Sequence, residues 1–185
     1  MTLTVRDALL AHRRASGLTD DGNLHKRVDW LYVGPVPLPI PNPAWRKRVV
    51  VYHDVSHLLT GYGTDLSGEL DEGCFECGAG IGFFTPAWMF NLQALMGAMV
   101  LRPRKGLQAF LRGRAAKSVY RCDIEALLEV PLDEARADML ETPNETPDFG
   151  DSVALLANLM VGTVLSFAPV AAVAAGIGAA WWALA

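Results

Sequence analysis

Hydrophobic and polar residues follow a helical spacing at the start of the chain. In residues 4–16, Val5, Leu9 and Leu10 recur near the 3.6-residue repeat of an α-helix, and arginines lie elsewhere on the helical wheel. The pattern changes in residues 33–43, where prolines at every second position exclude a helix interior and favour extended polyproline geometry. We therefore expect a short amphipathic helix and a stiff connector within residues 1–41.

Start and stop signals divide the middle of the chain into helices. Asn42 followed by Pro43 is a strong start, and glycines end the apolar run that follows, which predicts a helix over about residues 44–60. Thr64 or Asp65 then provides the cap of a second helix. No stretch shows the two-residue period of a strand, so we expect an all-α fold. Further helices are expected over residues 85–101, 105–116 and 131–140.

Residues 152–185 form a separate, apolar zone. No charged side chain follows Asp151, and Trp181 and Trp182 near the end suit a membrane interface. One helix of about 34 residues would be roughly 50 Å long, beyond a hydrocarbon core of about 30 Å, yet two full spans need about 20 residues each. The alternatives are one span with a bent or interfacial lead-in, a hairpin of two shortened helices, and a buried pair of core helices.

A second uncharged stretch, residues 77–101, precedes the sequence Arg102-Pro-Arg-Lys and so imitates a membrane span with a positive flank. Its glycines, together with Asn91 and Gln93, disfavour that interpretation. We expect instead a core helix, or a helix that lines an apolar pocket. Four zones result: a helix and connector (1–41), a metal-binding helical core (42–141), a proline-rich acidic linker (142–151) and the apolar tail (152–185).

Composition narrows the class of protein. The 185 residues suffice for about one domain with its own core. Hydrophobic residues make up 51% of the chain and charged residues 19%, a more apolar composition than that of ordinary soluble domains. This composition suggests contact with a membrane surface. The formal net charge of −4 argues against a nucleic-acid partner, because phosphates require a dominant basic surface.

The charge is unevenly distributed. No Asp or Glu lies between Glu76 and Asp123, an interval that suits anionic lipid headgroups or the carboxylate or phosphate of a substrate. Solvated surface charge explains the same residues equally well. The cations of this interval are Arg102, Arg104, Lys105, Arg112, Arg114, Lys117 and Arg121.

The three cysteines indicate a reducing compartment. Their number is odd and the chain shows no secretory signal, so disulfides are not expected and a bacterial cytoplasmic setting is the simpler interpretation. Cys74 and Cys77 form a Cys-x-x-Cys pair, but no partner pair accompanies them. We therefore expect them to be cysteines of a helical core.

His53, Asp54, His57 and Glu69 form a candidate metal site. Residues four apart on a helix share one face, so His53 and His57 can aim two imidazole nitrogens at one point. Asp54 is close enough to bind or orient, and the glycine-rich turn after the helix can fold Glu69 back over the histidines. Imidazole and carboxylate ligands suit zinc first, with iron(II) or manganese as alternatives.

Two other interpretations fit the histidines alone. A solvated or capping cluster is the plainer one, since the five-residue pattern is weak by itself. A metalloprotease would need Glu directly after the first histidine, where this chain has Asp54 with its shorter reach.

The string Tyr-His-Asp-Val-Ser-His-Leu-Leu-Thr-Gly-Tyr-Gly-Thr-Asp-Leu-Ser-Gly-Glu, residues 52–69, resembles the signature of the coenzyme Q biosynthesis protein four family. That family's motif is His-Asp-x-x-His, eleven residues, then Glu. The similarity continues through Phe75-Glu76 and into residues 112–136, and covers about residues 41–140. Two features depart from it: the Asp71-Glu-Gly that follows the motif, where family members are usually apolar, and the tail after residue 151.

The resemblance implies a role in ubiquinone biosynthesis. The expected activity is that of a metal-dependent decarboxylase (a lyase): oxidative decarboxylation of a polyprenylated benzoate-type intermediate, organisation of the other biosynthetic enzymes, or both. Partners would be the polyprenylated aromatic lipid, those enzymes and the cytoplasmic side of a bacterial inner membrane, with the chain as a monomer or homodimer. Glu76 could orient a ligand from the second shell, although an exposed glutamate is the interpretation that the sequence favours. The apolar stretch before Arg102 could house the isoprenoid tail.

Two rival functions remain open. A non-catalytic lipid-binding scaffold would use a structural zinc to hold two helices together. A metal-dependent lipid hydrolase would use the same ligands on a different substrate.

Overall fold

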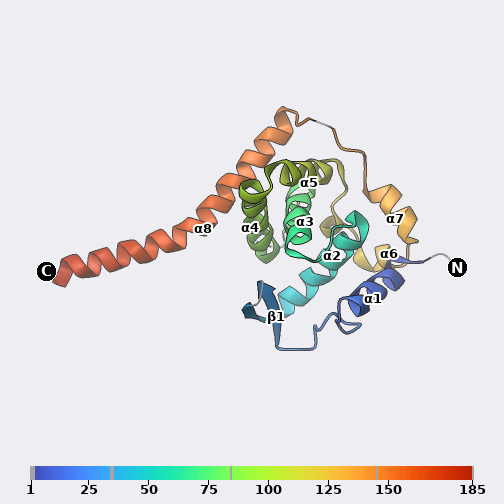
Figure 1. The fold of residues 1–185 in the computed structure, drawn as a ribbon, viewed down its shortest axis with the longest axis horizontal. Helices are drawn as coiled ribbons and strands as arrows, with labels where there is room; N and C mark the ends of the chain where they lie inside the picture. The colour runs from blue at the N-terminus through green and yellow to red at the C-terminus, as the bar shows by residue number, and fades with distance from the viewer. Residues whose placement is uncertain (1–2, 34–35, 84, 145, 185) are drawn as a thin grey trace.

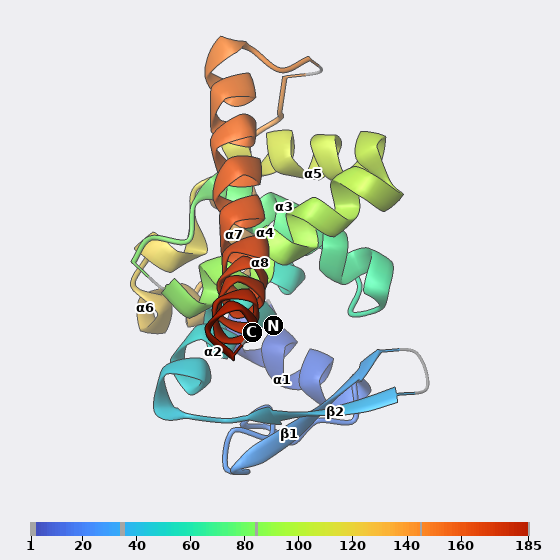
Figure 2. The same ribbon diagram turned by 90° about the vertical axis from the view of Figure 1, so that its left-hand side faces the viewer.

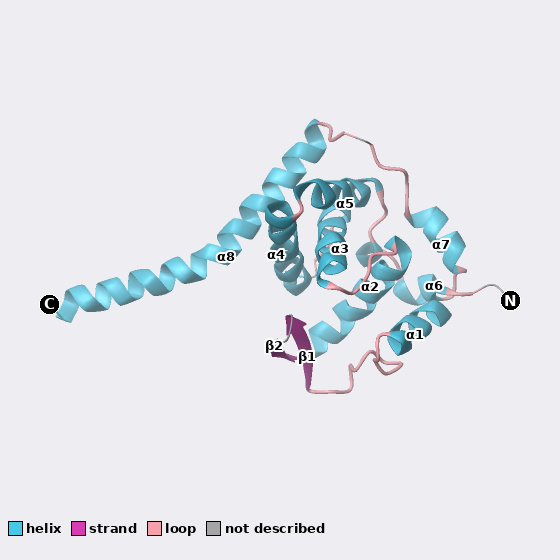
Figure 3. Cartoon of the chain, in the orientation of Figure 1, coloured by secondary structure: helices cyan, strands magenta, loops and turns pink. Residues whose placement is uncertain are grey.

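The computed structural model describes residues 3–33, 36–83, 85–144 and 146–184, and the fold is mostly helical (Figure 1). A helical domain carries one β-hairpin, and a long helix projects from it (Figure 3). The elements are α1 (Val5–Ala15), β1 (Val28–Val33), β2 (Val36–Pro41), α2 (Ala44–Thr60), α3 (Leu66–Ala79), α4 (Thr85–Leu101), α5 (Pro103–Ala115), the 3₁₀ turn η1 (Val119–Arg121), α6 (Ile124–Leu128), α7 (Leu132–Met139) and α8 (Phe149–Leu184).

The amphipathic helix expected at the start is confirmed as α1. Thr4 and Asp7 form a capping box, in which each side chain bonds the backbone amide of the other. Val5 and Leu9 are buried in a core cluster with residues of α2, α6 and α7.

The expected all-α class is confirmed, with one exception: the proline-rich connector, expected to be polyproline, forms half of a β-hairpin. β1 and β2 are antiparallel, and Trp30 pairs with Pro39. Proline lacks the N–H that a central strand must donate, but each strand of a two-stranded sheet has an outer edge that needs no such donor. Prolines at alternate positions can therefore all occupy one edge of β2.

The expected helices of the middle region are confirmed, with one difference at a cap. Asn42 does not cap α2. Pro43 stands at the cap position, and the Asn42 side chain bonds Asn23 and Arg46 instead. Asp65 caps α3 by accepting from the amide of Gly68.

Glycines allow α3 and α5 to pack with their backbones in close contact. A Cβ atom added to Gly78 would lie 2.2 Å from the carbonyl oxygen of Phe110, and one added to Gly113 would lie 2.0 Å from that of Phe75. No larger residue fits at either position without a shift of the backbone. α4 covers the same pair of helices with the buried side chains of Leu92 and Leu95, so the uncharged stretch before Arg102 is a core helix, as expected.

α8 is one continuous helix, which excludes a hairpin of two short ones. Its first half crosses α4, where Leu155 and Leu159 pack on the core and Gly162 contacts Met96. Its second half leaves the domain (Figure 1). Of the most apolar 18-residue window only 6% is buried, which also excludes the alternative of a buried pair of core helices. Among the described residues α8 is the one helix long and apolar enough to cross a membrane, judged by length and composition.

Candidate metal centre

Two imidazoles and one carboxylate converge between α2 and α3. His53 and His57 lie one turn apart on α2, and their Nε2 atoms are 3.1 Å from each other. The tight turn at Gly61 reverses the chain, so that α3 brings Glu69 against both rings. The carboxylate oxygens of Glu69 lie 3.4 Å from His53 Nε2 and 3.5 Å from His57 Nε2. The expected convergence of these three residues is thus present.

Each histidine is held through its other ring nitrogen. His57 Nδ1 lies 3.1 Å from the carbonyl oxygen of Tyr62, which can only accept, so Nδ1 carries the proton. His53 Nδ1 lies 3.0 Å from Glu76 Oε1. In the neutral form both Nε2 atoms then carry lone pairs that face each other, and either a proton or a metal ion between them would satisfy both. Metal-binding histidines are commonly oriented in this way by a carbonyl or carboxylate.

The spacing of the three donor groups fits a small divalent cation. Two ligands at 2.0–2.1 Å from a tetrahedral zinc are separated by about 3.3 Å. The measured separations of 3.1, 3.4 and 3.5 Å lie around that value. The donor set of two nitrogens and a carboxylate is also one that zinc, iron(II) or manganese accepts.

The site is closed on one side and open on the other. The His57 side chain is 2% exposed, whereas those of His53 and Glu69 are 27% and 42% exposed. The side chains of His53 and Glu69 are therefore both in contact with solvent. A site with three protein ligands and an accessible fourth position is typical of catalytic zinc.

The structure does not bring Asp54 to this group. Both Arg13 Nε and Nη2 donate to Asp54 Oδ2, at 2.9 and 2.7 Å, and the two side chains are only 6% and 15% exposed. Asp54 thus anchors α2 to α1, directly beside His53 in sequence but on another face of the helix.

Glu76 is buried, which rules out the exposed-glutamate alternative and agrees with its expected role beside a ligand. Its side chain is 1% exposed, and three groups donate to it: His53, the Asn91 amide and the Tyr120 hydroxyl, the last at 2.9 Å. These donors come from α2, α4 and η1. The carboxylate therefore fixes His53 against three separate parts of the domain.

Glu72, which the sequence did not single out, is a second buried carboxylate beside the site. It is fully buried and accepts from the hydroxyls of Ser56 and Thr60, and one of its oxygens lies 3.9 Å from His57 Nδ1. The sequence signal that could have identified Glu72 is its position one helical turn after Glu69 on α3. An acidic residue on the apolar face of a helix is costly to bury unless it is paired.

The carboxylates shift the pKa values of the site. Burial alone would lower the pKa of His53, but the charge of Glu76 and hydrogen bonds to Glu69 and Glu76 outweigh burial and raise that pKa well above 6.5. The pKa of His57 is also raised, mainly through Glu69 against the effect of burial. Burial would raise the pKa of Glu69, but both imidazoles hold it far below its ordinary value. Burial and the charge of Glu76 raise the pKa of Glu72.

The basic interval is mostly paired within the domain. Arg102 bonds Asp71, Arg114 bonds Asp151, and Lys117 bonds Asp138. Arg112 lies over the ring of Tyr62, 5.2 Å from its centre. These contacts leave little of the interval available as one continuous anion-binding surface.

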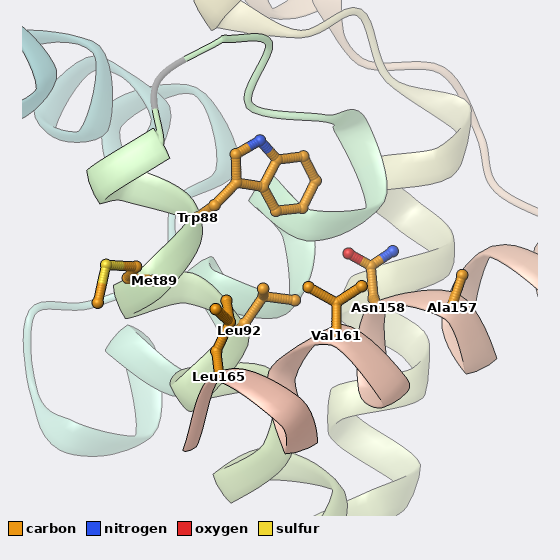
Figure 4. Close-up of a pocket in the computed structure, with 7 residues that line it drawn as sticks. All are labelled: Trp88, Met89, Leu92, Ala157, Asn158, Val161 and Leu165. Carbon is orange, nitrogen blue, oxygen red and sulfur yellow. The ribbon is translucent and has the colours of Figure 1, made fainter. Parts of the chain in front are cut away.

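An apolar pocket of about 410 Å³ lies where α8 crosses α4 (Figure 4). Leu92 lines this pocket, and Asn91, the preceding residue on α4, donates to Glu76 beside the metal ligands. The pocket and the hydrogen bonds of Glu76 therefore involve adjacent residues of α4. The lining residues of the pocket are Trp88, Met89, Leu92, Ala157, Asn158, Val161 and Leu165.

The cysteines are free thiols, and Cys74 and Cys77 are buried in the core of α3 as expected. Burial raises the pKa of Cys74 to about 12 and that of Cys77 well above 9.0. Neither has the thiolate character of a redox or metal-binding cysteine.

Comparisons with protein-family models, curated proteins and solved structures give no match to this chain.

Proposed function

We propose that this chain binds a divalent cation, zinc in the first place, through His53 Nε2, His57 Nε2 and the Glu69 carboxylate. The observation that carries this proposal is the pair of facing Nε2 atoms, whose Nδ1 atoms are both committed to other partners. A carboxylate of strongly lowered pKa completes the donor set. Iron(II) and manganese are the alternatives for the same donors.

The open side of the site favours catalysis over a purely structural cation. A structural zinc has four protein ligands, and the fourth ligand that the sequence suggested, Asp54, is held by Arg13. The fourth position therefore belongs to water or to a substrate oxygen. A bound cation there would polarise a carboxylate or hydroxyl, and a redox-active one would add oxygen chemistry.

The reaction that we propose is the metal-dependent, oxidative decarboxylation of a polyprenylated benzoate in ubiquinone biosynthesis. The support is the motif of residues 52–69 and its resemblance to the coenzyme Q biosynthesis protein four family, together with the pocket at α4 and α8. Apolar burial contributes about 0.8 kcal/mol per CH₂, so a polyprenyl tail in this pocket would hold a substrate firmly. Asn91 and Leu92 would place the aromatic end near the metal and the tail in the pocket.

In this proposal each residue around the metal ligands has its own role. Glu76 keeps the proton on His53 Nδ1, so Nε2 stays available as a ligand. Tyr120 and Asn91 hold Glu76 in place. The buried Glu72 fixes α2 through Ser56 and Thr60 and keeps His57 in a polar surrounding. The setting that we propose is the cytoplasmic side of a bacterial inner membrane, beside the other enzymes of the pathway.

Metal content and quinone profile together test this function. Purified protein should contain close to one equivalent of metal by mass spectrometry, and His57→Ala should lose it. His25→Ala is the matched control, because His25 lies at the surface with Asp21 as its partner. In a deletion strain, a prenylated aromatic acid should accumulate, and Glu69→Ala should fail to restore quinone. Normal quinone levels in the deletion strain would refute the proposed reaction.

A scaffold with a structural cation is the second candidate, and the position of the site supports it. One core cluster joins α1, α2, α6 and α7, and another joins α3, α4, α5 and α8. The ligands lie on α2 and α3, so a cation would tie the two clusters together. Metal-loaded protein that has no open coordination position and leaves quinone levels unchanged would favour this candidate over the enzyme.

A further inference from the structure

The far half of α8 extends away from the domain (Figure 1). Among the described residues, the hydrogen bond between Ser166 and Gln93, at 2.7 Å, is the last one that joins α8 to the domain. Residues 167–184 continue beyond it as 18 helical residues without any charge. At 1.5 Å per residue they extend about 27 Å, close to the thickness of about 30 Å of a hydrocarbon core.

The side of the domain from which α8 departs is formed by the hairpin, the beginning of α2 and α4. In Figure 1 the hairpin and α4 reach furthest in the direction in which α8 projects. Figure 2 looks onto this side, with the end of α8 pointing at the viewer and the hairpin below it. We call this side, bounded by β1, β2, the start of α2 and the start of α4, the docking face.

Large apolar side chains are exposed on the elements of the docking face. Trp30 and Phe90 each expose more than half of their surface. The helices α1, α6 and α7, on the other side of the domain, expose no large hydrophobic side chain. Leu66, Val100, Leu101 and Phe149 are also exposed, outside the docking face. The docking face differs in having several such side chains together, as an interaction surface does. The exposed residues of the docking face are Trp30, Val36, Trp45, Phe83, Met89 and Phe90.

The same elements carry a cluster of cations. The amide of Asn42 donates to the carbonyl of Arg27 at 2.9 Å, which brings the base of the hairpin to the start of α2. Lys26 and Arg27 thus precede the hairpin at the start of the helix that carries Lys47 and Arg48. None of these four has an ion pair with a described side chain. Residues 26–48 contain five cations and one acid in a chain of net charge −4.

We propose that the docking face binds the surface of an anionic lipid bilayer, with residues 167–184 of α8 inserted in it. Exposed tryptophans and phenylalanines suit the headgroup level, and the cations complement anionic headgroups. The span would need no charged group to enter the hydrocarbon. A second copy of this chain would explain the apolar side chains but not the cluster of like charges. The surface is independent of the metal site, so either proposal can fail without the other.

Site-specific quenching in lipid nanodiscs tests the docking face on the full chain. A fluorophore is attached at Val36→Cys or at Phe90→Cys, in a Cys122→Ser background where the buried Cys74 and Cys77 stay unreactive. Headgroup-labelled quenching lipids are included with phosphatidylglycerol. Both probes should be quenched and blue-shifted, whereas a probe at Glu134→Cys on α7 should show neither change.

Removing two charges from the docking face, and two from α1 as a control, tests the role of the cations in docking. Lys47→Gln with Arg48→Gln should reduce the docked population by about fivefold for each charge removed. Arg6→Gln with Arg14→Gln removes the same charge from exposed sites on α1 and should change nothing. Equal quenching on both sides of the domain would overturn the proposal. So would an emission shift at the docking face that depends on protein concentration rather than on anionic lipid, which would indicate a second copy.

Discussion

The two core clusters of the domain are built differently. The cluster of α1, α2, α6 and α7 is formed by aliphatic side chains under a polar surface, and the buried Arg13–Asp54 pair crosses it. The cluster of α3, α4, α5 and α8 relies on glycines that bring backbones together, and it continues into an apolar helix. The first supplies the imidazoles of the candidate metal centre and the second supplies the carboxylates. Neither cluster alone contains a complete site.

The largest expected effect comes from removing the cation that joins the two clusters. With free metal about a thousandfold above its dissociation constant, chelation should lower the free energy of unfolding by about 4 kcal/mol. Denaturant titrations in detergent, with and without a chelator, measure this difference. In Glu69→Gln the difference should nearly vanish. Equal stability of the wild-type protein with and without chelator would contradict the bridging role.

Asp54→Asn should affect the first cluster and leave the metal in place. Removing one partner of a mostly buried ion pair costs about 3 kcal/mol, because Arg13 keeps its charge. Unfolding experiments and metal analysis on the same variant separate the two roles. Asp20→Asn, which breaks the exposed pair with Arg14, should change stability far less. Loss of metal with unchanged stability would instead make Asp54 a ligand.

Gly78→Ala should affect the second cluster. The added methyl would collide with the carbonyl oxygen of Phe110, and overpacking of this kind costs about 2 kcal/mol. Gly176→Ala on α8 is the control, since no atom lies within 4 Å of the added Cβ and alanine favours a helix. Thermal unfolding should show a loss for the first variant only. A neutral Gly78→Ala would mean that α3 and α5 separate easily.

Glu76→Gln should weaken metal binding without removing a ligand. Loss of an orienting carboxylate beside a metal-binding histidine lowers affinity by about 10- to 100-fold. Competition with a chromophoric chelator measures this change, and Glu134→Gln on the exposed side of α7 serves as control. Unchanged affinity in Glu76→Gln would show that His53 is held without its carboxylate.

The smallest effect is a dependence of metal affinity on pH. A cation binds only an imidazole that has lost its proton, and the carboxylates raise the pKa of His53 and His57 above 6.5. Affinity should therefore decline as pH falls, beginning above pH 6.5, by at most about tenfold per pH unit for each proton displaced. Glu76→Gln removes the main charge that raises the pKa of His53, so the decline should begin at lower pH. Affinity that is independent of pH between 6 and 8 would contradict the ligand assignment.

Much of the fold follows from local signals in the sequence. Gly61 and Asp65 mark the end of α2 and the start of α3, and the spacing of His53, His57 and Glu69 then places three ligands together. Such signals act within a few residues, so one sequence is enough to find them.

The features that the sequence did not reveal depend on distant contacts. Asp54 pairs with Arg13, 41 residues away, and Glu72 and Glu76 are buried by partners from other helices. The hairpin was missed because alternate prolines read as polyproline until β1 supplies a partner strand. α8 continues past Pro169, although proline lacks a backbone donor, and is one helix from Phe149 to Leu184.

The continuity of α8 has a mechanical consequence. A flexible linker would let a tethered domain sample many heights and orientations, whereas a helix transmits both along its length. α8 is one rod from its crossing of α4 to its end, with no loop between. Whatever holds the far half of this rod also sets the direction in which the pocket and the three converging side chains face.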